Sequence, residues 1–227
     1  MTNQLAVAPG VTLWSLRLDA AEQKALLDDV FAGIAQAPLF EPTMPRTGKK
    51  FSVRMTNFGP LGWVSDAVKG YRYEPLHPAT AEAWPPIPPA LLRLWDETTR
   101  YAAPPQACLV NFYAAGARMG LHRDQDEPAV DAPVLSVSLG DSAYFRFSTA
   151  NLKGETRRLK LASGDVLMFG GPARLMYHGI DRILSGTSTL IPGGGRINLT
   201  LRRVTQPGPN PNKEALTRGL GRASNAP

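Results

Sequence analysis

The chain of 227 residues is long enough for one domain of ordinary size with a hydrophobic core. Its 43% hydrophobic and 19% charged content are globular values, which exclude an intrinsically disordered chain. The net charge of +6 and a pI of about 9.7 favour encounters with polyanions such as nucleic acids, although a basic composition alone assigns no partner.

The composition also limits where the protein works. No run of about 18 apolar residues is present, so we expect no membrane span. Residues 1–10 lack the basic segment and apolar stretch of a secretory signal, so we expect a cytoplasmic protein. The single cysteine, Cys108, lies in an apolar run and is predicted to be buried. An intrachain disulfide and multi-cysteine zinc or iron–sulfur sites are therefore excluded.

The N-terminal part predicts one long helix after an irregular or extended segment over residues 1–18. Asp19 and Glu22 have the spacing of a capping box, which places the start of the helix at this point. Apolar side chains then recur at helical spacing until Pro38 ends the pattern. These side chains are Leu26, Leu27, Val30, Phe31 and Ile34.

The segment after this helix is less regular. Residues 41–50 read as a basic loop, and residues 51–57 as a strand. Residues 58–89 are rich in glycine, proline and aromatic residues and show little periodicity, and long segments of this kind often form lids or binding loops. A second helix is predicted over residues 90–101. Its apolar face consists of Leu91, Leu94 and Trp95.

Short β-type runs separated by turn residues dominate the chain after residue 105. We predict strands over residues 107–113, 134–139, 144–147, 157–161, 166–169, 175–178 and 196–203. Many short strands with turn signals between them are typical of a β-sandwich or barrel. Residues 206–227 are rich in proline, glycine, asparagine and alanine and are predicted to be mobile.

Two of the three histidines fall where a metal site would need them. His122 and Asp124 are two residues apart, so in an extended segment both side chains point to one face and can hold one ion. His178 follows at the end of a predicted strand. Two imidazoles and one carboxylate form the facial triad of iron(II) oxygenases, but zinc hydrolases and cupin-like binders also use such ligands. His77 lies in a proline-rich loop and is predicted not to be a ligand.

The strand over residues 196–202 alternates between apolar and polar side chains. Its polar face carries Arg196, Asn198, Thr200 and Arg202. If the apolar face packs under a helix or sheet, this polar face points into the barrel, where arginines are costly unless they meet anions. A dicarboxylate would satisfy them through guanidinium–carboxylate forks. Asn111 and Tyr113 show the same alternation and could complete such a site.

From about residue 51 to 203 these segments together resemble the AlkB family of alkylation-repair dioxygenases. The resemblance is carried by residues 55–63, 111–113, 122–128, 136–140, 177–180 and 196–202. It implies a mainly β fold with flanking helices (α+β), namely a double-stranded β-helix (jelly-roll) core. It further implies an N-terminal extension with a nucleotide-recognition lid over residues 1–105, a catalytic core over 106–205 and a tail over 206–227, within one structural domain.

The resemblance also implies a role for particular residues. The iron ligands would be His122, Asp124 and His178. Arg196 would bind the distal carboxylate of 2-oxoglutarate and Arg202 would lie by its metal-proximal carboxylate. The cosubstrate would also be held by Asn111, Tyr113 and Asn198. The substrate contacts would be Trp63, Tyr71, Arg72, Tyr73 and Asp126, of which the last matches a carboxylate that reads a flipped base.

The implied activity is oxidative demethylation of N-alkylated bases of the 1-methyladenine and 3-methylcytosine type in single-stranded DNA or RNA. It would use Fe(II), 2-oxoglutarate and O2, with ascorbate as reductant in vitro, and release succinate and formaldehyde. A base in a duplex must be flipped out to reach such a site. We expect a monomer, because a lid must open over a long polymer. A basic cluster beside the lid offers phosphate contacts: Arg46, Lys49, Lys50 and Arg54.

The chain departs from the family pattern in three places. The segment between Trp63 and Tyr71 is one residue longer, residues 149–157 align poorly, and Phe169 stands where the family has tryptophan. Three alternatives stay open from the residues alone. They are a 2-oxoglutarate oxygenase acting on a tRNA base or a protein, a non-catalytic nucleic-acid-binding module, and a cupin-type metal-dependent binder of small molecules.

Overall fold

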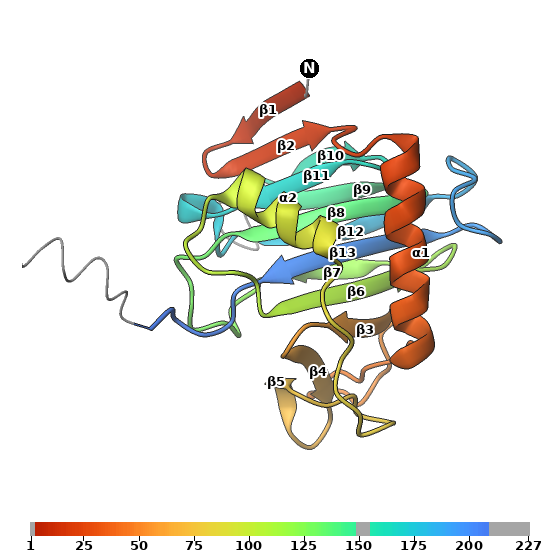
Figure 1. Ribbon diagram of the computed structural model, residues 1–227, viewed down its shortest axis with the longest axis vertical. Coiled ribbons are helices and arrows are strands. Elements are labelled where there is room, and N and C mark those ends of the chain that lie inside the picture. The colour runs from red at the N-terminus through yellow and green to blue at the C-terminus, as the bar shows by residue number, and fades with distance from the viewer. Residues whose placement is uncertain (1–2, 149–154, 209–227) are drawn as a thin grey trace, which may run out of the picture.

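The computed structural model describes residues 3–148 and 155–208, and shows two antiparallel sheets with helices on one side (Figure 1). The larger sheet contains, in spatial order, β1 (Asn3–Ala8), β2 (Val11–Ser15), β11 (Val166–Phe169), β8 (Val134–Gly140), β13 (Arg196–Arg202), β6 (Ala107–Tyr113) and β3 (Arg54–Phe58). The smaller sheet contains β10 (Arg157–Leu161), β9 (Ser142–Ser148), β12 (Tyr177–Leu184) and β7 (Met119–His122). Buried side chains from both sheets share one core cluster, which places the two sheets face to face as in the predicted jelly roll.

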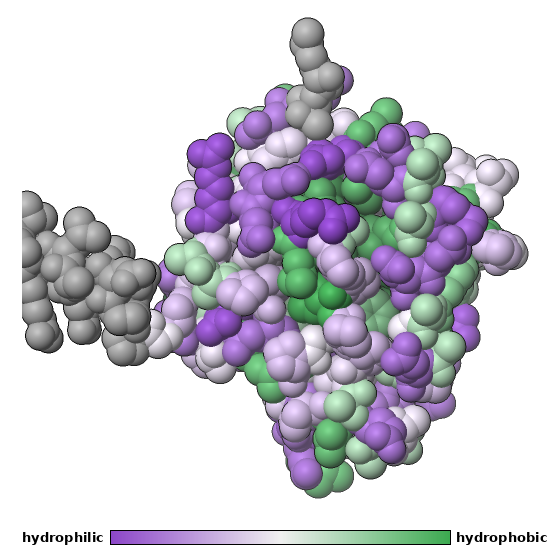
Figure 2. All heavy atoms as spheres, in the orientation of Figure 1, coloured by the Kyte–Doolittle hydropathy of each residue, from purple (hydrophilic) through white to green (hydrophobic). Residues whose placement is uncertain are grey.

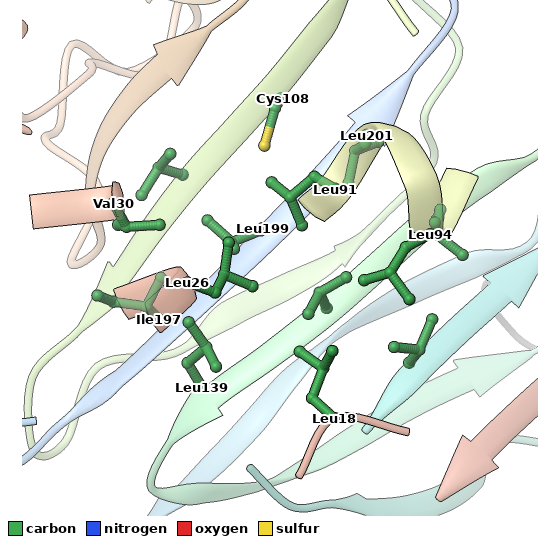
Figure 3. Packing of buried hydrophobic residues seen from close by; sticks show 14 of the residues in the cluster. Leu18, Leu26, Val30, Leu91, Leu94, Cys108, Leu139, Ile197, Leu199 and Leu201 are labelled. Atoms are coloured by element: carbon green, nitrogen blue, oxygen red, sulfur yellow. The ribbon is translucent and has the colours of Figure 1, made fainter. Parts of the chain in front are cut away.

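Two helices, α1 (Ala20–Gln36) and α2 (Pro89–Thr99), cover the outer face of the larger sheet (Figure 1). The predicted capping box is confirmed, since Asp19 Oδ1 accepts from the Glu22 amide at 2.8 Å and Glu22 Oε2 accepts from the Asp19 amide at 2.9 Å. Figure 3 shows the helices packed on β13 through a cluster that includes Leu26, Val30, Leu91, Leu94, Ile197, Leu199 and Leu201. The apolar face of β13 is therefore turned to the helices and its polar face to the space between the sheets.

A two-stranded hairpin lies apart from the two sheets, at the foot of the molecule in Figure 1. It consists of β4 (Gly62–Asp66) and β5 (Gly70–Glu74), two strands within residues 58–89 that were not predicted from the sequence. Asp66 Oδ1 accepts from the amides of Val68 and Lys69 and closes the turn. Strands of five residues with glycine at their ends carry too little periodicity to be recognised in a sequence.

Other predictions differ from the structure in their boundaries. Residues 1–18 contain a hairpin whose second strand joins the larger sheet, and the strand predicted over 51–57 is β3, three residues later. The strand predicted to end at His178 instead begins beside it and continues to Leu184. β7 was not predicted, because four residues interrupted by a glycine give no alternating pattern. A 3₁₀ turn, η1 (Gly171–Ala173), precedes β12.

The remaining expectations concern burial and domains. Cys108 is fully buried, and burial raises the pKa of its thiol, so it is an inert core residue as predicted. Within the described ranges, neither helix combines the length and apolar character needed to cross a bilayer. β1, β2 and β3 complete the larger sheet, so the division at residue 105 stays a prediction about roles within one domain. Residues 209–227 of the predicted tail lie outside the described residues.

Candidate metal and cosubstrate site

His122, Asp124 and His178 meet at the open edge of the smaller sheet, where β7 pairs with β12. Their candidate ligand atoms all lie within 4.8 Å of one another. His122 Nε2 is 3.8 Å from Asp124 Oδ1, and His178 Nε2 is 3.9 Å from Asp124 Oδ2. Because metal–ligand bonds in proteins are about 2.1 Å long, two ligand atoms on one ion lie at most about 4.2 Å apart, and the two histidine–aspartate separations meet that limit. The structure thus brings the predicted triad together.

The electrostatic surroundings keep Asp124 and His178 in their metal-binding forms. Burial raises the pKa of the Asp124 carboxyl, but Arg202 and the two histidines outweigh burial, so the net pKa falls well below its ordinary value. Burial and the neighbouring His122 lower the pKa of His178 to about 4, so that imidazole is neutral. A carboxylate and a neutral imidazole are the protonation states that bind a metal ion.

Arg202 is already paired with carboxylates of the protein itself. Its Nε lies 3.0 Å and its Nη2 2.9 Å from Asp124 Oδ2, and its Nε is 3.5 Å from Glu127 Oε1. From the sequence we expected both Arg196 and Arg202 to bind a dicarboxylate, but Arg202 forms its ion pairs within the protein. Arg202 therefore holds an iron ligand in place and also lines the cavity next to it.

Two residues that the sequence argument missed complete this network. Arg174 is 3% exposed and donates to the carbonyl of Asp124 at 2.6 Å, to the carbonyl of Ala132 at 2.8 Å and to Glu127 Oε2 at 3.0 Å. Glu127 also accepts from the Tyr73 hydroxyl. These contacts fix the loop that carries the metal-binding carboxylate and attach the lid hairpin to it. Glu127 stands in the family motif, whereas no local pattern marks Arg174, which reaches the loop only through the fold.

A cavity beside the triad, the cosubstrate cavity, is lined by four of the five residues predicted to hold the cosubstrate; Arg196 is buried and does not line it. It is lined by Asn111, Tyr113, Asn198 and Arg202 together with His122 and His178. Two buried polar atoms in this region have no hydrogen-bond partner among the described residues, Asn111 Oδ1 and Arg196 Nε. Because buried polar groups are normally paired, such atoms indicate a missing polar ligand. A dicarboxylate fits the arginine, and a donor or an ordered water would satisfy the amide oxygen.

Arg196 is the residue whose environment most strongly indicates an anion. It is completely buried, and its guanidinium donates to neutral oxygens, namely the Asp141 and Leu161 carbonyls and Ser138 Oγ. Burial lowers its pKa to about 10, and Tyr113 and Asp165 offset the effect of burial only in part. The carboxylate of a cosubstrate would supply the remaining compensation. The residues present therefore fit the iron and 2-oxoglutarate that the resemblance implies.

A second cavity of about 410 Å³, the lid cavity, adjoins the triad on the side of the lid hairpin. Trp63 of β4 and Tyr71 of β5 stack on each other with ring centroids 5.4 Å apart and form one wall. His122 and Asp126 also line this cavity, and Asp126 Oδ2 accepts from Trp63 Nε1 at 3.1 Å. The cavity thus joins an aromatic wall, a carboxylate and a metal ligand, and its volume is in the range of small-molecule sites.

Arg72 and Tyr73 do not line this cavity, and their role as substrate contacts stays a prediction. Arg72 pairs with Asp66 and Glu74 at 2.6 Å within the hairpin. Tyr73 points to Glu127. In the basic cluster near the lid, Lys50 pairs with Glu41 and the Arg54 guanidinium lies over Phe112, while Arg46 and Lys49 are exposed. His77 lies in a loop, as predicted, where its ring contacts Phe40 and Trp84 and hydrogen-bonds to the Pro38 carbonyl.

Comparison with known proteins places this site in a family. Residues 10–202 match the 2OG-Fe(II) oxygenase superfamily. An alpha-ketoglutarate-dependent dioxygenase AlkB homolog of Caulobacter vibrioides is 56% identical over 204 residues, covering 90% of this chain and 92% of the relative. Alpha-ketoglutarate-dependent dioxygenase AlkB of Escherichia coli is 40% identical over 201 residues, covering 87% and 91%. A solved structure of OsALKBH1 aligns with a TM-score of 0.75 at 30% identity, covering 88% of this chain and 99% of that one.

The fold and the triad thus define an iron(II)- and 2-oxoglutarate-dependent oxygenase, and the chain belongs to that superfamily. Identity over nearly the full length of two such relatives places it among the dioxygenases of the AlkB type. The protein is therefore an enzyme of this class, and the alternatives of a non-catalytic nucleic-acid-binding module and a cupin-type binder are rejected. The predicted cofactors, Fe(II) and 2-oxoglutarate with O2, follow from the same match.

The residues of the site have separable tasks in this chemistry. When bound, iron(II) and 2-oxoglutarate would activate O2, which is the oxidant, and the protein would position the reactants and shield them from water. His122, Asp124 and His178 would hold the ion, and Arg196 would hold the cosubstrate. Phe145 and Phe169 lie against the His178 ring, with centroids 5.8 and 4.8 Å away, and exclude water from the buried side of the site.

Metal binding should stabilise the fold, because the triad joins β7, β12 and the loop after β7. At a concentration near 100 times its Kd, Fe(II) or the redox-inert substitute Mn(II) should raise Tm by roughly 5–10 °C. Differential scanning fluorimetry with and without EDTA measures this shift, and His122→Ala serves as the control that should show none. An equal shift in that variant would mean that the ion binds elsewhere.

Proposed function

We propose that this dioxygenase removes methyl groups from ring nitrogens of damaged nucleobases, of the 1-methyladenine and 3-methylcytosine type, in single-stranded DNA or RNA. The observation that carries this proposal is the composition of the 410 Å³ cavity. Its stacked aromatic wall of Trp63 and Tyr71 suits a flat ring, and the metal ligand His122 lines the same space. A base flipped out of its strand would bring its alkyl group beside the iron.

Asp126 supports a cationic base as the preferred substrate. Methylation of these ring nitrogens gives the base a positive charge, which a nearby carboxylate favours. The carboxylate can also accept a hydrogen bond from an exocyclic amino group. Its present partner is the indole N–H of Trp63 at 3.1 Å, so the substrate would share or replace this bond. The pocket thereby offers both charge and shape for an alkylated base.

The nucleic-acid partner, the oligomeric state and the location belong to the same proposal. The net charge of +6 supports a polyanionic substrate. A monomer leaves the lid hairpin free to open over a long strand. The location we propose is the cytoplasm.

Formaldehyde release tests the proposal. A single-stranded oligonucleotide with one 3-methylcytosine is incubated with enzyme, Fe(II) and ascorbate, with and without 2-oxoglutarate, and the unmethylated oligonucleotide is the control. Release that requires both 2-oxoglutarate and the methyl group supports the demethylase. Succinate without formaldehyde would instead move the substrate to another modified base, as in tRNA, or to a protein.

Trp63→Ala should separate substrate binding from cosubstrate oxidation. Base–aromatic stacking contributes ~1–3 kcal/mol, so the KM for the methylated oligonucleotide should rise about 5- to 150-fold. Slow 2-oxoglutarate consumption without nucleic acid should be unchanged, because Trp63 lines the lid cavity and not the cosubstrate cavity. Val68→Ala, in the exposed turn of the same hairpin, is the matched control. Equal losses in both reactions would count against Trp63 as a base contact.

A further inference from the structure

The outer face of the smaller sheet carries cationic side chains that the chemistry of the site does not use. We call this set the basic face: Arg118, Arg146, Arg158, Lys160 and Arg182. The strands place four of them in two rows across the sheet. Gly179 of β12 pairs with Arg146 of β9, which pairs with Arg158 of β10. The next row runs from Arg182 through Tyr144 to Lys160.

This arrangement costs stability, which argues that it serves another purpose. Arg146 and Arg158 are directly opposite on neighbouring strands, and like charges in that position repel. Asp181 is the one carboxylate in β7, β9, β10 and β12, all of which the structure describes. Its Oδ2 is 2.7 Å from Arg158 and its Oδ1 is 4.0 Å from Arg146. One carboxylate thus faces five cations, so most of the positive charge remains for a partner.

A groove of about 400 Å³ begins this face next to the active site. Its sides carry Arg118 and Arg146, and its lining includes Gly120 and Gly179, which have no side chains to fill it. At Gly179 a Cβ would lie 2.5 Å from the Met119 carbonyl oxygen, so only glycine allows the bulged β7 to approach β12 so closely. The groove and the lid cavity share three lining residues of β7, namely Met119, Gly120 and Leu121. A chain leaving the cavity therefore meets the basic face after crossing one strand.

The opposite side of the molecule has no such excess. The α1 and α2 segments, residues 17–36 and 89–100, carry six carboxylates and four cations. Figure 2 shows this helix-covered side, where hydrophilic and hydrophobic side chains alternate over a mixed surface. Positive charge is thus concentrated on the smaller sheet, beside the cavity. A charge asymmetry of this kind orients a polyanion during its approach.

We propose that the basic face binds the phosphodiester backbone of the strand that carries the target base, along the nucleotides that flank it. The inference rests on the proposed function for its substrate class. The four strands of the smaller sheet span about 14 Å, which is long enough to contact more than one phosphate of a single strand. The guanidinium of Arg158 on β10 lies over the Tyr144 ring of β9 at 5.0 Å, which presents a flat cationic surface on the two strands of this face farthest from the cavity.

The salt dependence of binding tests this track independently of turnover. The double variant Arg146→Ala/Arg182→Ala is compared with Lys24→Ala/Arg93→Ala, which removes the same charge from the exposed helix side. Fluorescence anisotropy gives the affinity for a labelled single strand of about 15 nucleotides between about 50 and 200 mM salt. Each lost phosphate contact lowers the log–log slope by about 0.7, so the first variant should lose about 1.4 and the control nothing.

Turnover on two substrate lengths supplies the second readout. In Arg146→Ala/Arg182→Ala, the KM for a methylated strand of about 15 nucleotides should rise, while the KM for a methylated trinucleotide should stay unchanged. An unchanged salt slope, the same loss in the helix-side control, or an equal rise in KM for the trinucleotide would each overturn the track. If the parent protein releases no formaldehyde from either substrate but the double variant still has the smaller salt slope, the track would be supported and the proposed demethylation rejected.

Discussion

His122→Ala should abolish 2-oxoglutarate turnover while the protein stays folded. Loss of residues that merely orient a metal ligand costs about 10- to 100-fold in affinity or activity, so loss of a ligand itself should exceed 100-fold. The side chain of His122 is 41% exposed, and its removal leaves little buried cavity. The variant should therefore lose iron binding with almost no change in Tm without metal. Iron titration, succinate formation and a circular-dichroism melt measure the three quantities.

The other two ligands are less suitable for this test. Asp124→Ala would leave Arg202 buried without its carboxylate, and breaking a buried ion pair costs about 3–5 kcal/mol. Lost activity could then reflect unfolding. His77→Ala is the matched control: His77 is 2% exposed and bonded to the Pro38 carbonyl and two amides. That variant should melt earlier yet still bind iron and turn over, and retained turnover in His122→Ala would refute the assigned triad.

The elements that sequence analysis predicted well are those whose pattern is local. β6, β10 and β11 were predicted at the residues where they occur, because each is a short β-type run next to turn residues. The start of α1 was found through the reciprocal cap of Asp19 and Glu22. Strict alternation of apolar and polar residues in β13 predicted which face points between the sheets, since only the apolar face could pack under a helix. In these cases a few neighbouring residues determine the structure.

The features that escaped prediction depend on contacts between distant residues. β7 and the lid hairpin have short strands whose pairing, not whose composition, defines them. Arg174 lies 50 residues from the Asp124 carbonyl that it holds, and nothing beside it in the sequence indicates that contact. The rows of the basic face arise in the same way, because β9, β10 and β12 bring separate arginines into register. The chemical residues were recognisable, whereas the residues that position them were not.

Arg196→Met should sharply weaken 2-oxoglutarate binding while leaving the fold without cosubstrate close to its original stability. Truncating one partner of a buried charge pair costs about 2–5 kcal/mol of binding, which corresponds to a Kd increase of roughly 30-fold to several thousand-fold. Without cosubstrate the guanidinium meets neutral oxygens and one of its nitrogens has no partner among the described residues. Replacing such an incompletely compensated cation with an apolar side chain of similar volume is often neutral or stabilising.

The comparison of two variants distinguishes the anion site from a purely structural arginine. Ser138→Ala removes a buried hydroxyl that accepts from Arg196 Nη2 at 2.7 Å and keeps the charge, so the Kd for 2-oxoglutarate should rise by about 10-fold or less. Isothermal titration in the presence of Mn(II) measures both constants, and fluorimetry measures the stabilisation by 2-oxoglutarate, which Arg196→Met should lose. If Arg196→Met binds 2-oxoglutarate normally but melts much earlier, the arginine supports the fold and the distal carboxylate lies elsewhere. A weak binder that melts normally places that carboxylate on Arg196, since a residue needed only for packing could not give this pair of results.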